Sequence, residues 1–170
     1  CYNFQELRPW LVERGHAFRT RCDTEVLVHL YEEVGPEMVE RLRGMFAFAV
    51  WDRRNRTLFA ARDRLGQKPL FYWHDPKLRI FGFASELKAL LTVPGAPREV
   101  SPRAIHDYLT YQYVPHPQCI IEGMHKLPPA HCLKWKNGQV TTWRYWRPAY
   151  RPDYQTSPHV LSEQLSETMT

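Results

Sequence analysis

The sequence predicts an α+β domain in which antiparallel strands form a sheet, covered by a second sheet on one face and by helices on the other. Two observations lead to this fold class. The run 45–51 (MFAFAVW) is apolar at nearly every position, so a strand there must bury both of its faces. Helical patterns with a single apolar face precede this run, and short polar turns separate the strand patterns that follow it.

The first 43 residues predict three helices with apolar residues spaced three or four apart. In the second helix, Val26, Leu27 and Leu30 form the apolar stripe. Gly15 and Gly35 end the first two helices, because glycine readily adopts the backbone conformation that terminates a helix. We expect helices over residues 6–14, 24–33 and 36–43, and a short alternating strand over 16–21.

Strand patterns dominate the next hundred residues. Asn137-Gly138, between two alternating runs, is the strongest local hairpin signal in the chain. Ser101 followed by Pro102 is a typical helix start, and Ser85 is expected to cap a shorter helix. We expect hairpins that pair 45–51 with 57–62, 70–73 with 78–83, and 132–136 with 139–145, a loop over 63–69, and helices over 86–91 and 102–111.

From the sequence at its two ends, we expect this chain to be part of a longer protein. Prolines at 148, 152 and 158 mark residues 148–158 as a linker after a first domain, residues 1–147. A helical pattern resumes over 159–170, where we expect a second domain to begin. The chain opens without a strand or helix before Cys1, so we expect further residues upstream.

Composition and charge exclude several classes of protein. The 170 residues are 44% hydrophobic and 14% aromatic, which is enough to bury a core. No apolar run approaches the roughly 20 residues of a membrane helix, so we expect no membrane partner. The net charge of +5 is interspersed with acidic residues rather than gathered in a patch, which argues against nucleic-acid binding.

The four cysteines are irregularly spaced and include no Cys-x-x-Cys pair. A core-rich domain of this size needs no disulfide framework, so we expect reduced thiols and a cytoplasmic location. Zinc ligation by Cys119, His125, His131 and Cys132 is conceivable. Their spacing matches no standard ligand pattern, so no metal site is expected.

Several runs, taken in order and with their spacing, resemble one family. They are 23–26 (DTEV), 42–52 (LRGMFAFAVWD), 61–70 (ARDRLGQKPL), 83–90 (FASELKAL), 113–115 (YVP) and 126–129 (KLPP). From Tyr2 to about Trp146, the chain resembles the glutaminase domain (a class II glutamine amidotransferase) of the bacterial B-type glutamine-hydrolysing asparagine synthetase. Such an ordered set is far more specific than one motif.

The resemblance implies both a fold and a reaction. The fold is a four-layer αββα sandwich of the N-terminal-nucleophile hydrolase type, with two antiparallel sheets between helix layers and its N-terminal strands missing from this chain. In the reaction, an N-terminal cysteine attacks the side-chain amide of glutamine and releases ammonia. A C-terminal synthetase domain, with ATP and Mg²⁺, then converts aspartate to asparagine. The expected partners are glutamine and the synthetase domain of the same chain. A second copy of the protein, forming a homodimer, is a further expected partner.

Asp23 is the one substrate-binding residue that carries over from the family. The resemblance implies that its carboxylate binds the α-ammonium group of glutamine. Without the resemblance, the sequence favours another role, in which Asp23 caps the helix that begins at Thr24. Both roles are compatible, since one carboxylate can accept hydrogen bonds from two partners. Cys22, where the family more often has serine, is expected to be a small packing residue.

No catalytic residue is expected within the chain, because the resemblance places the nucleophilic cysteine and its oxyanion donors before Cys1. Cys1 is followed by Tyr2 instead of Gly-Ile, and it stands where the family has a hydrophobic residue. The alternative is that Cys1 is itself the nucleophile, since a free α-amine beside a thiol is chemically suitable.

The loop 63–69 combines opposite charges with glycine. For Asp63, Arg64 and Gly66 the sequence favours a turn fixed by ion pairing over a catalytic role. Arg62 and Lys68 are candidates to face a second domain.

The predicted function is the glutaminase half of a glutamine-hydrolysing asparagine synthetase. Neither the Ser-Gly-Gly-x-Asp-Ser pattern of the synthetase domain nor a P-loop occurs in the sequence, so no nucleotide site is expected here. Two alternatives remain. One is an amidotransferase of the same architecture that acts on another carboxylate, and the other is a non-catalytic interaction module.

Overall fold

The computed structural model describes residues 1–152 and 154–169. Its elements in chain order are α1 (Phe4–Val12), α2 (Asp23–Val34), the 3₁₀ turn η1 (Gly35–Glu37), α3 (Met38–Arg41), β1 (Ala47–Asp52), β2 (Thr57–Arg62), β3 (Phe71–Asp75), β4 (Ile80–Ala84), α4 (Leu87–Leu90), α5 (Pro102–Tyr111), β5 (Met124–Lys126), β6 (His131–Lys136), β7 (Gln139–Arg144) and α6 (Pro158–Met169).

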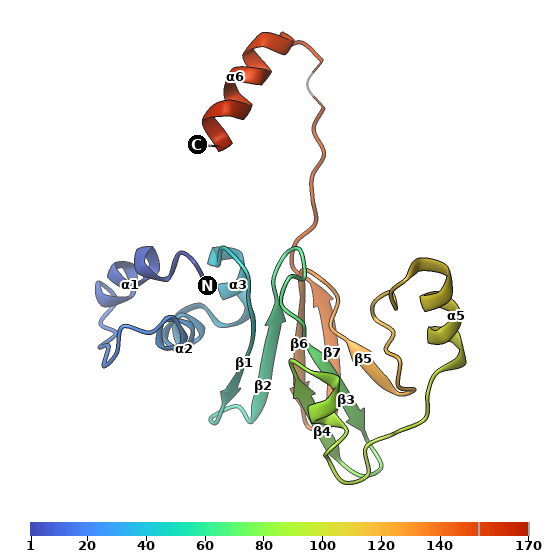
Figure 1. Ribbon diagram of the computed structural model, residues 1–170. Helices are drawn as coiled ribbons and strands as arrows, with labels where there is room; N and C mark the ends of the chain where they lie inside the picture. The colour runs from blue at the N-terminus through green and yellow to red at the C-terminus, as the bar shows by residue number, and fades with distance from the viewer. Residues whose placement is uncertain (153, 170) are drawn as a thin grey trace.

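The strands form two antiparallel sheets. The four-stranded sheet has the order β1-β2-β6-β7, and the three-stranded sheet has the order β4-β3-β5. Figure 1 shows α1, α2 and α3 on the outer side of the first sheet, while α4 and α5 lie on the side of the second sheet. The arrangement is the predicted four-layer αββα sandwich.

Alternation along β2 explains why this strand is apolar on both faces. Phe59 and Ala61 point toward the helices and join the cluster that holds Leu30 and Met38. Ala60 points the other way, into a cluster between the two sheets that also holds Leu70, Leu127 and Leu133. Successive residues of a strand face opposite sides, so a central strand with two covered faces must be apolar throughout.

The second sheet is covered on its outer face by α4. Trp73 and Met124 from the sheet pack there with Leu90 of the helix. The Cβ position of Gly82 lies 3.2 Å from Leu90 Cδ2, so the helix approaches the β4 backbone closely. A larger side chain at position 82 would push the layers apart.

The hairpin predicted at Asn137-Gly138 is confirmed. The two residues have φ values of 53° and 76°, the left-handed pair that a two-residue hairpin turn requires. Lys136 pairs with Gln139, so the turn sets the register of β6 against β7. The other two predicted hairpins are also present, as β1–β2 and β3–β4.

The strand predicted over residues 16–21 is wrong. The backbone N–H groups of Arg19 and Thr20 donate to the carboxylate of Glu25, each at 2.7 Å, instead of to a neighbouring strand. The segment therefore folds onto the first turn of α2. The helix predicted over 36–43 is shorter as well, because η1 and α3 divide it and Leu42 is already extended.

The helix predicted at 86–91 begins one residue later, at Leu87. Its N-cap is Glu86, which makes no side-chain cap hydrogen bond, so Ser85 does not cap it. The helix predicted at Pro102–Tyr111 has those bounds, although its N-cap Ser101 makes no side-chain cap bond either.

Residues beyond the sheets carry α6, which Figure 1 shows at a distance from both sheets. None of the α6 residues is buried. The expected linker includes residue 153 and the expected second-domain helix includes residue 170, which lie outside the described residues. Within the described part of the chain, no helix is long and apolar enough to cross a membrane.

Candidate functional site

Asp23 is the first residue of α2, not the cap that precedes it. The N-cap position belongs to Cys22, whose backbone is extended and whose side chain makes no cap hydrogen bond. This corrects the alternative in which Asp23 caps a helix beginning at Thr24. Asp23 and Glu25 place two carboxylates in the first turn, where the positive end of the helix dipole favours them.

The Asp23 carboxylate is partly exposed and lies next to Cys1. The amino nitrogen of Cys1 donates to Asp23 Oδ2 at 3.1 Å, and the side chain of Asp23 is 40% exposed. Cys22 Sγ lies 3.5 Å from Oδ1. The hydrogen bond from the Cys1 amino group is the main reason that the pKa of Asp23 lies below its ordinary value.

The residues around Cys1 are anchored to the segment that leads into β1. Cys1 Sγ contacts Asn3 Oδ1 at 3.3 Å, and the buried Asn3 side chain accepts from Arg43 N and donates to Arg41 O, both at 2.9 Å. Tyr2 N donates to Arg43 O at 2.9 Å. These bonds fix the position of the Cys1 amino group in front of α2.

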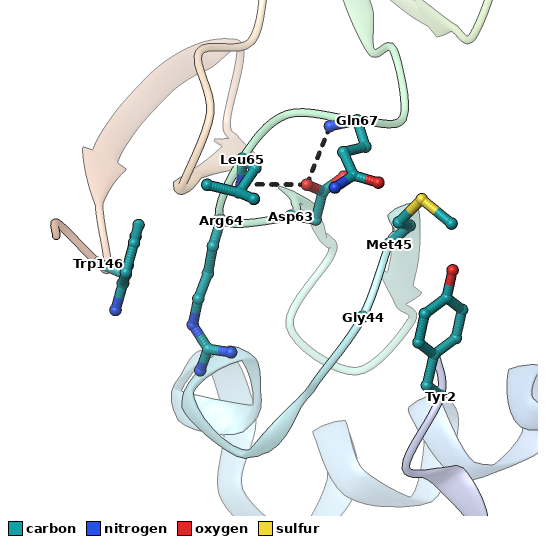
Figure 2. A pocket seen from close by; sticks show the side chains of 8 residues that line it. All are labelled: Tyr2, Gly44, Met45, Asp63, Arg64, Leu65, Gln67 and Trp146. Carbon is teal, nitrogen blue, oxygen red and sulfur yellow. Dashed lines mark hydrogen bonds between the residues drawn. The ribbon is translucent and has the colours of Figure 1, made fainter. Parts of the chain in front are cut away.

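A pocket of about 360 Å³ lies next to this anchored segment (Figure 2). Tyr2 and Met45 form one side, Trp146 stands on the opposite side, and the loop of Asp63 lies between them. Gly44 has φ +100° and a Cβ there would lie 2.6 Å from Tyr2 Cγ, so the Tyr2 ring rests directly on the glycine backbone.

Asp63 organises the loop that forms the wall of this pocket. It is 2% exposed, and its carboxylate accepts from the backbone N–H groups of Leu65 (3.2 Å), Gln67 (3.0 Å) and Lys68 (3.0 Å). Figure 2 shows the bonds to Leu65 and Gln67. Burial alone would raise the pKa of Asp63, but the backbone hydrogen bonds outweigh it and hold that pKa below its ordinary value.

Arg62 joins three parts of the backbone. Its guanidinium donates to the carbonyls of Lys68 (2.7 Å), Gly66 (2.6 Å) and Leu127 (2.7 Å). Tyr145 Oη donates to the Arg62 carbonyl at 2.9 Å. Arg62 therefore connects the two sheets, and the expectation that it also faces a second domain stays a prediction.

Arg64 holds the end of α3. Its guanidinium donates to the carbonyls of Leu42 (3.1 Å) and Glu40 (3.2 Å), the negative end of that short helix. Figure 2 shows its side chain extending away from Asp63. Hydrogen bonds between the backbone and each of the two charged side chains therefore fix the turn. The expected ion pair between Asp63 and Arg64 is not what fixes it.

The structure separates the residues that the sequence could have suggested as zinc ligands. Among the described residues, Cys119, His125, His131 and Cys132 do not converge on one point, and all four cysteines are free thiols. A different set, His16, His29 and Glu32, does converge. The sequence reasoning missed this set, and its only local signal is the spacing of three residues between His29 and Glu32.

Two antiparallel sheets between helix layers make this domain an αββα sandwich. The family model of the glutamine amidotransferase domain matches residues 1–146. The chain belongs to this family.

Curated relatives share this part of their sequence. Asparagine synthetase [glutamine-hydrolyzing] 3 of Bacillus subtilis is 41% identical over 146 residues, which is 85% of this chain and 24% of that protein. Asparagine synthetase [glutamine-hydrolyzing] 1 of the same organism is 32% identical over 169 residues, 99% of this chain and 26% of the relative. The chain thus spans about a quarter of the length of these relatives. The predicted resemblance to this family is confirmed.

Two solved structures share the fold. A glutamine phosphoribosylpyrophosphate amidotransferase from B. subtilis, complexed with ADP and GMP, superposes with a TM-score of 0.54 at 20% identity, over 86% of this chain and 27% of that one. A structure titled as the allosteric regulatory enzyme of purine biosynthesis gives 0.56 at 19% identity, with the same coverage. They confirm the predicted fold class.

Proposed function

We propose that this chain is the glutamine-binding half of a glutamine-hydrolysing asparagine synthetase. In the whole protein, ammonia released from glutamine would convert aspartate to asparagine at a synthetase domain that requires ATP and Mg²⁺. The family match over residues 1–146 carries the proposal, and the names of the relatives support the choice of reaction. The four free thiols are consistent with the cytoplasm as its location.

Asp23 has the specific role of binding the α-ammonium group of glutamine. Its carboxylate is partly exposed and lies in the first turn of α2, where it can accept a hydrogen bond from an ammonium group. The α-ammonium group of glutamine is such a donor. An oriented carboxylate on the ammonium would fix the amino-acid end and leave the side-chain amide free to react.

The test is the substitution Asp23→Asn in the full-length protein. The amide keeps the size of the side chain but removes the charge, so we expect KM for glutamine to rise roughly ten- to thirtyfold. With ammonium salt supplied in place of glutamine, the variant should form asparagine from aspartate and ATP at the wild-type rate, because the synthetase step is untouched.

A matched control is Asp52→Asn, whose carboxylate instead accepts from Asn55 in the β1–β2 turn. It should keep the wild-type KM. An unchanged KM for glutamine in the Asp23→Asn variant would refute the role of Asp23. Amidation of another carboxylate in preference to aspartate by the wild type would refute the proposed acceptor.

A further inference from the structure

Two histidines and a glutamate bring three ligand atoms together on the outer face of α2. His16 follows α1 in the connecting loop, and His29 and Glu32 lie one turn apart on the helix, where a spacing of three places side chains on one face. His16 Nδ1 is 3.1 Å from His29 Nδ1, and Glu32 Oε2 is 3.2 Å from the latter and 3.8 Å from the former.

The Nε2 atoms of the His16 and His29 rings each lie near a carboxylate. His16 Nε2 lies 3.1 Å from Glu33 Oε2, and His29 Nε2 lies 3.9 Å from Glu25 Oε1. The hydrogen bond between His16 Nε2 and Glu33 favours the tautomer with its proton on that nitrogen, which leaves the lone pair on His16 Nδ1. His16 Nδ1, His29 Nδ1 and Glu32 Oε2 are close to one another, and a cation bound beside them could take all three as ligands once His29 Nδ1 is deprotonated.

The spacing of the three atoms suits a tetrahedral ion. With zinc–ligand bonds of about 2.0–2.1 Å, the edges of a tetrahedral site are about 3.3–3.4 Å long. The observed separations of 3.1, 3.2 and 3.8 Å bracket this value. Two imidazoles with one carboxylate are a typical ligand set for zinc, whereas calcium and magnesium prefer oxygen ligands alone.

The surroundings hold the two rings in place and leave one side open. The side chains of His16 and His29 are 14% and 17% exposed, and the Phe18 ring packs edge-on against His29 at 4.6 Å. Arg14 pairs with the other oxygen of Glu33 at 3.5 Å, which orients that carboxylate. Glu32 is 59% exposed, so water can reach the fourth coordination position.

We propose that His16 Nδ1, His29 Nδ1 and Glu32 Oε2 bind one Zn²⁺ ion, with water as the fourth ligand and Glu33 orienting His16. The ion ties the connection between α1 and α2 to the helix that begins at Asp23. Its role is to stabilise this part of the domain, and the site does not depend on the proposed reaction.

The test is zinc titration of the chelator-treated full-length protein by calorimetry, with Co²⁺ as a spectroscopic substitute. We expect one zinc ion per chain, and a roughly hundredfold fall in the unfolding equilibrium constant of this domain when zinc exceeds Kd a hundredfold. Bound Co²⁺ should show the visible absorption of four-coordinate cobalt without a thiolate charge-transfer band, since the ligands are nitrogen and oxygen.

Two variants and one control locate the site. Glu32→Gln, at a position that is 59% exposed, and His16→Ala should each weaken zinc binding at least tenfold. Glu163→Gln changes a comparable exposed His–Glu pair on α6, formed with His159, and should leave the affinity unchanged. Absence of zinc uptake, equal affinity of the Glu32→Gln variant and wild type, or a thiolate band with Co²⁺ would each overturn the proposal.

Discussion

The substitution Asp63→Asn tests whether a buried carboxylate organises the loop beside the pocket. Asp63 uses both oxygens: Oδ1 accepts from Leu65 and Gln67, and Oδ2 accepts from Lys68. An asparagine has only one side-chain oxygen, so it can replace either Oδ1 or Oδ2 as an acceptor. Its NH₂ group would then face the N–H of Lys68, or the N–H groups of Leu65 and Gln67.

The expected cost follows from the bonds that change. Facing a buried N–H with a second donor costs about 1–2 kcal/mol, and two bonds that lose a charged acceptor weaken by about 0.5–1 kcal/mol each. The variant should therefore be less stable by about 3 kcal/mol. The pKa of Asp63 is below its ordinary value of 3.8, so the carboxylate stabilises the folded state above that pH. The wild-type advantage should shrink as the pH falls below 3.8.

Pulse proteolysis of the full-length protein in urea measures the unfolded fraction of this domain. With a urea dependence of about 2 kcal/mol per molar, the midpoint should fall by about 1.5 M. Asp75→Asn is the matched control, because both of its turn bonds, from Lys77 and Leu78, end on Oδ1 and an amide oxygen can accept them. Equal midpoints for Asp63→Asn and Asp75→Asn at neutral pH would refute the reasoning.

Three further substitutions test other contacts. Gly66→Ala should lower the free energy of unfolding by at least about 2 kcal/mol. This is about the combined cost of a backbone φ of +68° and of a Cβ placed 2.7 Å from Pro129 Cγ, and a wild-type urea midpoint would contradict it. Tyr145→Phe removes the bond to the Arg62 carbonyl and should cost about 1 kcal/mol in the same assay. Hydrogen bonds from residues 19–20 lower the pKa of Glu25 from 4.5 to about 2. The wild type should therefore melt at a higher temperature than Glu25→Gln at neutral pH, and this difference should disappear as the pH falls from 4.5 to about 2.

The layers and hairpins were predictable from the sequence because their signals are local. Asn137-Gly138 encodes its own turn, and the apolar run 45–51 predicts a strand with two covered faces, which is found for Phe48 on one face and for Ala47 and Ala49 on the other. The strand predicted over 16–21 was wrong because a carboxylate six residues away, on Glu25, captures its N–H groups. Alternation alone does not show where backbone hydrogen bonds go.

The candidate site was only partly predictable. The role of Asp23 rests on the family resemblance and stays a prediction, and its place in the helix differs by one residue from the expected one, the usual uncertainty of a helix boundary. The roles of Arg62 and His16 depend on partners that the fold brings together: the Leu127 carbonyl is 65 residues from Arg62, and His29 is 13 residues from His16. Such pairings leave no periodic pattern in the chain.

Arg62 ties the two sheets together at one end of the sandwich. Where β2 ends, its guanidinium ties the first sheet to the segments that enter β3 and leave β5. Near the other end of β2, an open cavity of about 340 Å³ lies between Leu58, Phe81 and Trp135. We therefore expect thermal opening of the two sheets to begin at the end that holds this cavity, while the loop of Asp63 at the other end keeps its position.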